Sequence, residues 1–211
     1  MQNIDNSQES KKADALLVQL SANPYFDMLS SYSIGQLGLY YLAEYADRFG
    51  YVAKVKYYNS FDDVSKLLPE IIEKTSCRIL GFYVDSENIW ALRPLIPILH
   101  QRCPNTIITL GGPQVTGDPF GTMQLISNVT CGVIGEGEVP FLKLLQLKSY
   151  GDDDLSTING IIYNNSAGKL IVTTPQKQNL LIDEYGYPKR EKYCLDPDRI
   201  TFSQLITGRG C

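Results

Sequence analysis

The sequence predicts an α/β protein with a flavodoxin-like, doubly wound, five-stranded parallel sheet in the order 2-1-3-4-5. Two observations carry this prediction. Apolar runs alternate with segments of helical periodicity along the first two thirds of the chain, and continuous apolar strands between helices are typical of a parallel sheet covered on both faces. Right-handed crossovers then restrict the strand orders that such a sheet can take.

Five apolar runs are predicted as the parallel strands. The second run alternates apolar and polar residues, which is typical of a strand nearer the sheet edge, and the fourth is rich in β-branched residues. The predicted strands are Ala15–Ser21, Tyr51–Tyr57, Arg78–Val84, Thr106–Leu110 and Cys131–Ile134.

Five helices are predicted between and after these strands, from apolar residues at helical spacing. Ser33 is a candidate N-cap of the first helix, and Gly50 stands at its C′ position. Pro69 predicts a kink or a helix start in the second. The predicted helices are Ile34–Phe49, Asp62–Lys74, Trp90–Gln101, Pro119–Ser127 and Val139–Leu147.

The pattern changes after Tyr150. Gly160–Tyr163 and Lys169–Val172 flank a turn rich in Asn and Gly, which predicts a C-terminal β-hairpin. Residues 179–198 are predicted as a connector without regular structure, and residues 201–206 as one more strand. Because this segment is small and rich in loops, it is expected to be an appendage that packs on the main domain or on a further domain downstream.

Composition and charge exclude several classes of protein. Lys and Arg number 19 against 23 Asp and Glu, and no basic run occurs, so no nucleic-acid partner is expected. No apolar run is long enough to span a membrane, and the N-terminus carries no export signal, which predicts a cytoplasmic protein without a membrane partner. The five cysteines are scattered and predict free thiols. The single histidine, His100, excludes a site built from several histidines.

The predicted site lies beyond the carboxyl ends of the strands, where doubly wound sheets bind ligands. Two loops there are rich in glycine, at residues 111–113 and 135–138, and glycine allows a ligand to approach the backbone closely. A tight strand-to-helix turn explains the first loop equally well. The carboxylates of Glu136 and Glu138 are also explained by the positive end of a helix dipole. No dinucleotide fingerprint and no P-loop is present.

Three stretches in this order resemble the cobalamin-binding domain of B12-dependent radical S-adenosylmethionine (radical SAM) proteins. They are GFYV-D after the third strand, ITLGGPQVTGDP after the fourth and VIGEGEVPFLKLL after the fifth. In that family a hairpin, a connector and a strand lead into C-x-x-x-C-x-x-C, and residues 206–211 match the strand end and the first cysteine. The resemblance spans residues 13–211.

The resemblance implies a disordered polar N-terminus (1–13), a cobalamin-binding Rossmann-like domain (14–150), the hairpin and connector (151–198), and the start of a radical SAM domain (199–211). Cys211 would be one thiolate ligand of its [4Fe–4S] cluster, which needs further thiolates. The fragment alone is therefore expected to be inactive, whereas the complete protein would use S-adenosylmethionine for methyl transfer or related radical chemistry.

The implied cofactor of the fragment is cobalamin, with the downstream barrel as its partner. Ser21–Tyr25 stands where His-ligated B12 domains carry D-x-H-x-x-G, so cobalamin would bind without a protein imidazole. The resemblance assigns its binding to ten residues: Asn23, Tyr25, Asp85, Ser86, Gly111, Gly112, Pro113, Gly135, Glu136 and Gly137.

Another class of function stays open. A B12-like domain that binds no cofactor would act as an interaction or substrate-recruiting module, and visible absorbance after mixing with hydroxocobalamin distinguishes the two. A response-regulator-like receiver would use Asp85 as phospho-acceptor. That chemistry also needs an acidic pair after the first strand and a Lys after the fifth, where this chain has Ser21–Asn23 and Gly135–Glu136.

Overall fold

The computed structural model describes residues 12–20, 37–58, 61–177, 184 and 186–195. This part of the chain forms a seven-stranded sheet in the order β2-β1-β3-β4-β5-β6-β7. The strands from β2 to β5 are parallel, and β6 and β7 are antiparallel to their neighbours. The strands are β1 (Ala15–Leu20), β2 (Ala53–Tyr58), β3 (Ile79–Tyr83), β4 (Ile107–Gly111), β5 (Cys131–Val133), β6 (Ile161–Asn164) and β7 (Leu170–Val172).

The prediction of a five-stranded sheet was wrong in its extent, because the hairpin of β6 and β7 joins the same sheet. β6 pairs with β5, with Ile161 opposite Val133 and Tyr163 opposite Cys131. The physical reason is that the outer backbone groups of β5 need hydrogen-bond partners. The side chains of Ile161 and Tyr163 also enter the same buried cluster as Cys131. The sequence pattern contains the hairpin but not the strand with which it pairs.

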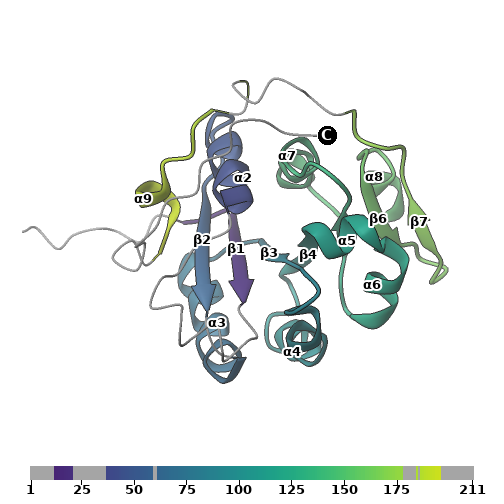
Figure 1. Cartoon of the computed structure of the whole chain (residues 1–211), viewed down its shortest axis with the longest axis horizontal. Helices are drawn as coiled ribbons and strands as arrows, with labels where there is room; N and C mark the ends of the chain where they lie inside the picture. Colours follow the sequence, from purple (N-terminus) through teal and green to yellow (C-terminus); the bar gives the residue numbers. More distant parts are fainter. Residues whose placement is uncertain (1–11, 21–36, 59–60, 178–183, 185, 196–211) are drawn as a thin grey trace, which may run out of the picture.

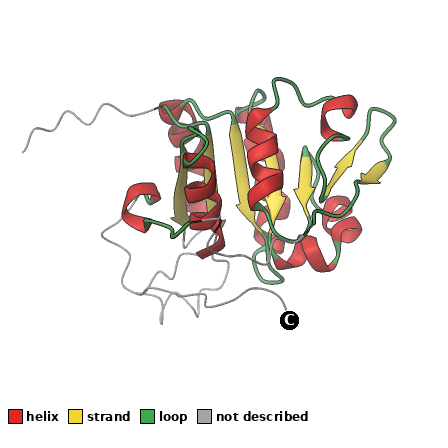
Figure 2. Ribbon diagram, turned by 90° about the horizontal axis from the view of Figure 1, so that it is seen from above, coloured by secondary structure: helices red, strands yellow, loops and turns green. Residues whose placement is uncertain are grey.

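Helices cover both faces of the sheet (Figures 1 and 2). Helices α2, α7 and α8 lie on one face, and α3, α4 and α6 on the other. Because side chains alternate along a strand, Ala15 and Leu17 of β1 pack toward α2 and α7, whereas Leu16 and Val18 pack toward α3 and α4. The helices are α2 (Leu37–Asp47), α3 (Phe61–Thr75), α4 (Ile89–Arg102), α5 (Pro113–Gly117), α6 (Pro119–Leu125), α7 (Glu138–Gln146), α8 (Asp152–Leu155) and α9 (Arg190–Tyr193).

Three prolines lie inside helices without ending them. α3 runs on through Pro69, so the expected helix start is not found there. Pro94 and Pro97 lie inside α4. A proline has no N–H for the carbonyl four residues earlier. For Pro94 that carbonyl belongs to Trp90, whose side chain is 62% exposed, so the missing bond lies on the solvent side.

The connector prediction was wrong for part of its length. Arg190–Tyr193 forms α9, and Cys194 makes a parallel bridge with Val55 of β2. Helices α5, α8 and α9 each have four or five residues, which is too short for a periodic pattern to reveal. Ser33, the predicted strand at 201–206 and Cys211 lie outside the described residues. Within the described part, no helix is both long enough and apolar enough to cross a bilayer.

Candidate functional site

The floor of the site is a row of residues across neighbouring strands, on the face that α2 and α7 cover. Leu17 of β1 stands beside Gly81 of β3, and Gly81 stands beside Thr109 of β4. Gly81 leaves a hollow in the middle of this row. A Cβ atom added there would come within 2.8 Å of Leu17 Cδ2 and 3.5 Å of Thr109 Cγ2. The end of the Leu17 side chain therefore reaches into the hollow that Gly81 leaves, and both residues line the cavity.

The hollow continues toward the carboxyl ends of the strands through Gly111, the last residue of β4. Gly111 stands beside Tyr83 of β3. A Cβ atom added to Gly111 would have Val133 Cβ, 4.0 Å away, as its nearest neighbour. Space therefore exists above Gly111, and the two glycines together give the sheet a flat floor of backbone.

Gly112 has a different role from Gly111. Its φ of +109° lies in a region that residues with a side chain rarely adopt. A Cβ atom there would lie 2.7 Å from the Val84 carbonyl oxygen and 3.2 Å from Tyr83 Cδ2. A substitution such as Gly112→Leu would thus strain the loop rather than fill the cavity.

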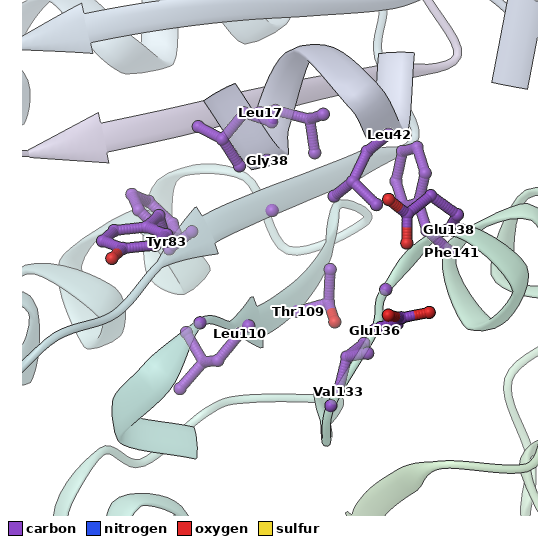
Figure 3. Close-up of a pocket in the computed structure, with 17 residues that line it drawn as sticks. Leu17, Gly38, Leu42, Tyr83, Thr109, Leu110, Val133, Glu136, Glu138 and Phe141 are labelled. Atoms are coloured by element: carbon purple, nitrogen blue, oxygen red, sulfur yellow. The ribbon is translucent and has the colours of Figure 1, made fainter. Parts of the chain in front are cut away.

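Together these residues enclose a cavity of about 490 Å³ between α2 and α7. Figure 3 shows Leu42 of α2 close to Phe141 of α7, with Tyr83 at one end of the pocket and Glu136 and Glu138 at the other. The walls are mostly apolar, which is typical of a site for an organic ligand. The lining residues are Leu17, Gly38, Leu39, Leu42, Gly81, Phe82, Tyr83, Thr109, Leu110, Gly111, Gly112, Val133, Gly135, Glu136, Gly137, Glu138 and Phe141.

Negative charge is concentrated at the α7 end of the cavity. Glu138 is 3% exposed and lies in the first turn of α7, where the helix dipole stabilises a carboxylate. Burial raises the pKa of Tyr45 on α2, and the Glu138 carboxylate acts in the same direction. At the opposite end, burial raises the pKa of Tyr83, helped by Asp85, so its phenol stays neutral at ordinary pH.

A buried amide fixes the junction between β1 and β3, where the strand order reverses. Asn88 is 1% exposed, and its Nδ2 donates to the carbonyl oxygens of Leu20 (3.1 Å) and Tyr83 (2.9 Å). The Asp85 carboxylate accepts the backbone N–H groups of Glu87 and Asn88 (2.9 and 2.8 Å). Asp85 therefore holds the start of α4.

The structure brings together half of the ten predicted site residues. Gly111, Gly112, Gly135, Glu136 and Gly137 line the cavity. Asp85, Ser86 and Pro113 do not line it. Asn23 and Tyr25 lie outside the described residues.

Sequence reasoning missed several lining residues. The signal for Gly81 was a glycine inside an apolar strand, which often marks a close approach of backbone or ligand. Thr109 carried no signal, because a threonine is ordinary in a strand. The hydroxyl of Thr109 donates to the Cys131 carbonyl oxygen (3.1 Å). Glu138 was explained only by the helix dipole, and its burial beside the cavity could not be read from the sequence.

The fold and this cavity define a chain of the B12-binding class. The model of the B12 binding domain matches residues 30–145, more than half of the chain, and the chain belongs to that family. All the residues that line the cavity fall within the matched range, except Leu17 of β1.

Two known proteins are informative relatives. The chain is 28% identical, over 155 residues, to the uncharacterized methyltransferase PH0819 of Pyrococcus horikoshii. It is also similar in structure to OxsB, a cobalamin-dependent S-adenosylmethionine radical enzyme. With aqua-cobalamin and S-adenosylmethionine bound, OxsB superposes with a TM-score of 0.62 at 14% identity over 79% of this chain. Apo OxsB gives 0.60 at 16% identity over 90%. This similarity shows the fold.

The chain spans a minor share of both relatives. It covers 32% of the methyltransferase and 23% of cobalamin-bound OxsB. The matched portion of this chain amounts to 72% in the first case and 79% in the second.

Proposed function

We propose that this chain binds cobalamin, with the nucleotide tail in the cavity between α2 and α7 and the corrin over the carboxyl ends of the strands. The observation that carries the proposal is the glycine floor of Gly81 and Gly111, in a chain of the B12-binding family. A volume of about 490 Å³ is within the range of small-molecule sites. The flat base of the tail would lie on the part of the floor where Gly81 and Gly111 carry no side chain, beside Leu17 and Thr109.

The cavity residues would have distinct tasks. Leu39 and Leu42 of α2 and Phe141 of α7 would cover the base and exclude water from it. Gly112, in the loop after β4, would let the corrin edge approach the backbone. The carboxylates of Glu136 and Glu138 can accept hydrogen bonds from the amide groups that surround a corrin.

The cobalt would have no imidazole ligand from this chain. His100 is its single histidine and lies in the last turn of α4. That turn is at the amino ends of the strands, whereas Gly111 and Gly112 are at the carboxyl end of β4. When bound, cobalamin supplies a cobalt centre that can carry a methyl group, and the protein positions it.

The activity of the complete protein is part of the proposal. We infer a radical SAM enzyme of methyltransferase type, with residues 199–211 leading into its next domain and Cys211 as a cluster ligand. The methyltransferase relative and the fold of OxsB support this reading. The [4Fe–4S] cluster and S-adenosylmethionine would belong to that domain.

Titration with hydroxocobalamin tests the proposal. The visible spectrum is followed during the titration, and bound cobalamin is measured after gel filtration. We expect saturable uptake by residues 1–211 and an unchanged cobalt spectrum in His100→Ala. Absence of uptake at high micromolar cobalamin would instead favour the interaction-module function. A spectral change in His100→Ala would refute the proposed absence of a protein imidazole.

A further inference from the structure

Two faces of helix α2 make contacts that bear on the cavity. One face lines the cavity through Gly38, Leu39 and Leu42. The other face binds a segment from much later in the sequence, Glu184 and residues 186–195, which we call the strap. Figure 1 shows α9, the helical part of the strap, beside β2 at the edge of the sheet.

Hydrogen bonds and an ion pair connect the strap to α2. The Tyr193 hydroxyl donates to Glu44 Oε2 (2.8 Å) and lies 3.4 Å from Asp47 Oδ2. Lys192 forms an ion pair with the same Asp47 carboxylate. Arg48 donates to the Glu184 carbonyl oxygen. Glu44 and Asp47 on the C-terminal half of α2, together with Arg48 directly after it, therefore hold one segment.

Two further hydrogen bonds connect the strap to β2. The backbone N–H of Leu195 donates to the Val55 carbonyl oxygen (2.9 Å). Lys54 Nζ donates to the Lys192 carbonyl oxygen (3.0 Å). Because β2 is an edge strand, this pairing satisfies backbone groups that would otherwise be exposed.

Packing connects the strap to the cavity wall. Tyr193 is 3% exposed, although it lies in a four-residue helix on the surface. Its ring belongs to the same buried cluster as Val55, Leu39 and Phe141. Leu39 and Phe141 line the cavity. A continuous apolar layer thus runs from the strap, under α2, to the ligand volume.

We propose that filling of the cavity and docking of the strap on α2 stabilise each other. The inference rests on the proposed function. A ligand between α2 and α7 sets the position of α2, and the strap needs α2 and β2 in one arrangement to make both sets of contacts. Coupling between two sites is reciprocal. Losing the strap must therefore weaken cobalamin binding by the factor by which cobalamin strengthens strap docking.

Hydrogen exchange tests one direction of this coupling. The amide of Leu195, which donates to the Val55 carbonyl oxygen of β2, reports strap docking. With saturating hydroxocobalamin, we expect this amide in residues 1–211 to exchange about fivefold more slowly, the lower end of typical coupling.

Affinity tests the other direction. Tyr193→Ala should bind hydroxocobalamin about fivefold more weakly than the wild type. Tyr193→Phe keeps the ring and loses the hydrogen bond to Glu44, so its affinity should lie between those of Tyr193→Ala and the wild type. Glu191→Gln, at an exposed strap position, is the control and should bind as the wild type does. Circular dichroism identifies any variant that fails to fold, and Tyr193→Phe then carries the test.

The two proposals fail in different ways. If the wild type takes up cobalamin while strap exchange and the affinities of both Tyr193 variants stay unchanged, the coupling is refuted and the proposed function stands. If the wild type takes up no cobalamin, both are refuted.

Discussion

Filling the space above Gly111 should abolish most of the cobalamin affinity without harming the fold. Gly111 has no left-handed backbone conformation to preserve, and an added Cβ atom would meet nothing closer than 4.0 Å. The side chain of Gly111→Leu would therefore extend into the apolar cavity. Its burial adds apolar contacts, so the free energy of unfolding should stay constant or rise by up to about 2 kcal/mol.

The loss of affinity can be worked out from what the side chain displaces. A dimethylbenzimidazole base has about eleven non-hydrogen atoms, and at about 0.3 kcal/mol per atom it contributes about 3 kcal/mol. Removing that contribution raises the Kd about 150-fold. The loss of affinity is limited to the contribution of the base, because the leucine side chain would occupy the floor of the cavity and leave the loops at the carboxyl ends of the strands in place.

The assay is a hydroxocobalamin titration beside a thermal unfolding curve of the same sample. Gly151→Val is the matched control, because Gly151 is outside the cavity and an added Cβ atom there also meets nothing within 4 Å. Gly111→Leu should bind about 150-fold more weakly with an undiminished melting temperature, and the control should bind normally. If Gly111→Leu bound within threefold of the wild type, the tail would not lie in this cavity.

Three further predictions concern the floor and the sheet. Asn88→Ala leaves two buried carbonyl oxygens without their side-chain donor and should lower the free energy of unfolding in urea by about 3 kcal/mol; a change below 0.5 kcal/mol would contradict its bridging role. Gly81→Ala places a methyl group 2.8 Å from Leu17 Cδ2, the end of a flexible side chain that lines the cavity, so it should cost about 1 kcal/mol or less in the same assay; a cost above about 3 kcal/mol would show that Leu17 cannot move. Burial raises the pKa of the Cys131 thiol to about 11, so iodoacetamide at pH 8 should label Cys131 only after denaturation. Since the folded state holds this proton more tightly than the unfolded state, ionisation of Cys131 should reduce stability as the pH rises from 9 toward 11, an effect absent in Cys131→Ala.

The parts of the fold that could be predicted are those that local pattern specifies. Continuous apolar runs identified the parallel strands, and the turn at Asn165–Gly168 identified the hairpin. The pairing of β6 with β5 could not be predicted, because it joins residues about 30 positions apart and depends on which edge is left open.

The site was predictable where the backbone itself is constrained. Gly111, Gly112 and Gly135 were predicted because glycine-rich loops at the carboxyl ends of the strands let a ligand approach the backbone, and all three line the cavity. Asp85 was assigned to the ligand from its position at a strand end, and that role stays a prediction. Its carboxylate accepts hydrogen bonds from the next turn, as Asp and Asn side chains commonly do, which the strand pattern did not indicate. Glu138 was not predicted as a lining residue because its burial depends on the approach of α2 from far away in the sequence.

The junction of β5 and β6 has a practical consequence for protein production. The family match ends at residue 145, but the outer edge of β5 is covered by residues 161–163. A chain shortened to the matched range would expose an apolar edge strand of three residues, Cys131–Val133, and would lack Ile158, Ile161 and Tyr163 from its core. Open apolar edges recruit strands from other chains. Expression ending at residue 145 should therefore yield aggregates, whereas a boundary beyond β7 keeps β5 paired with β6 inside the sheet.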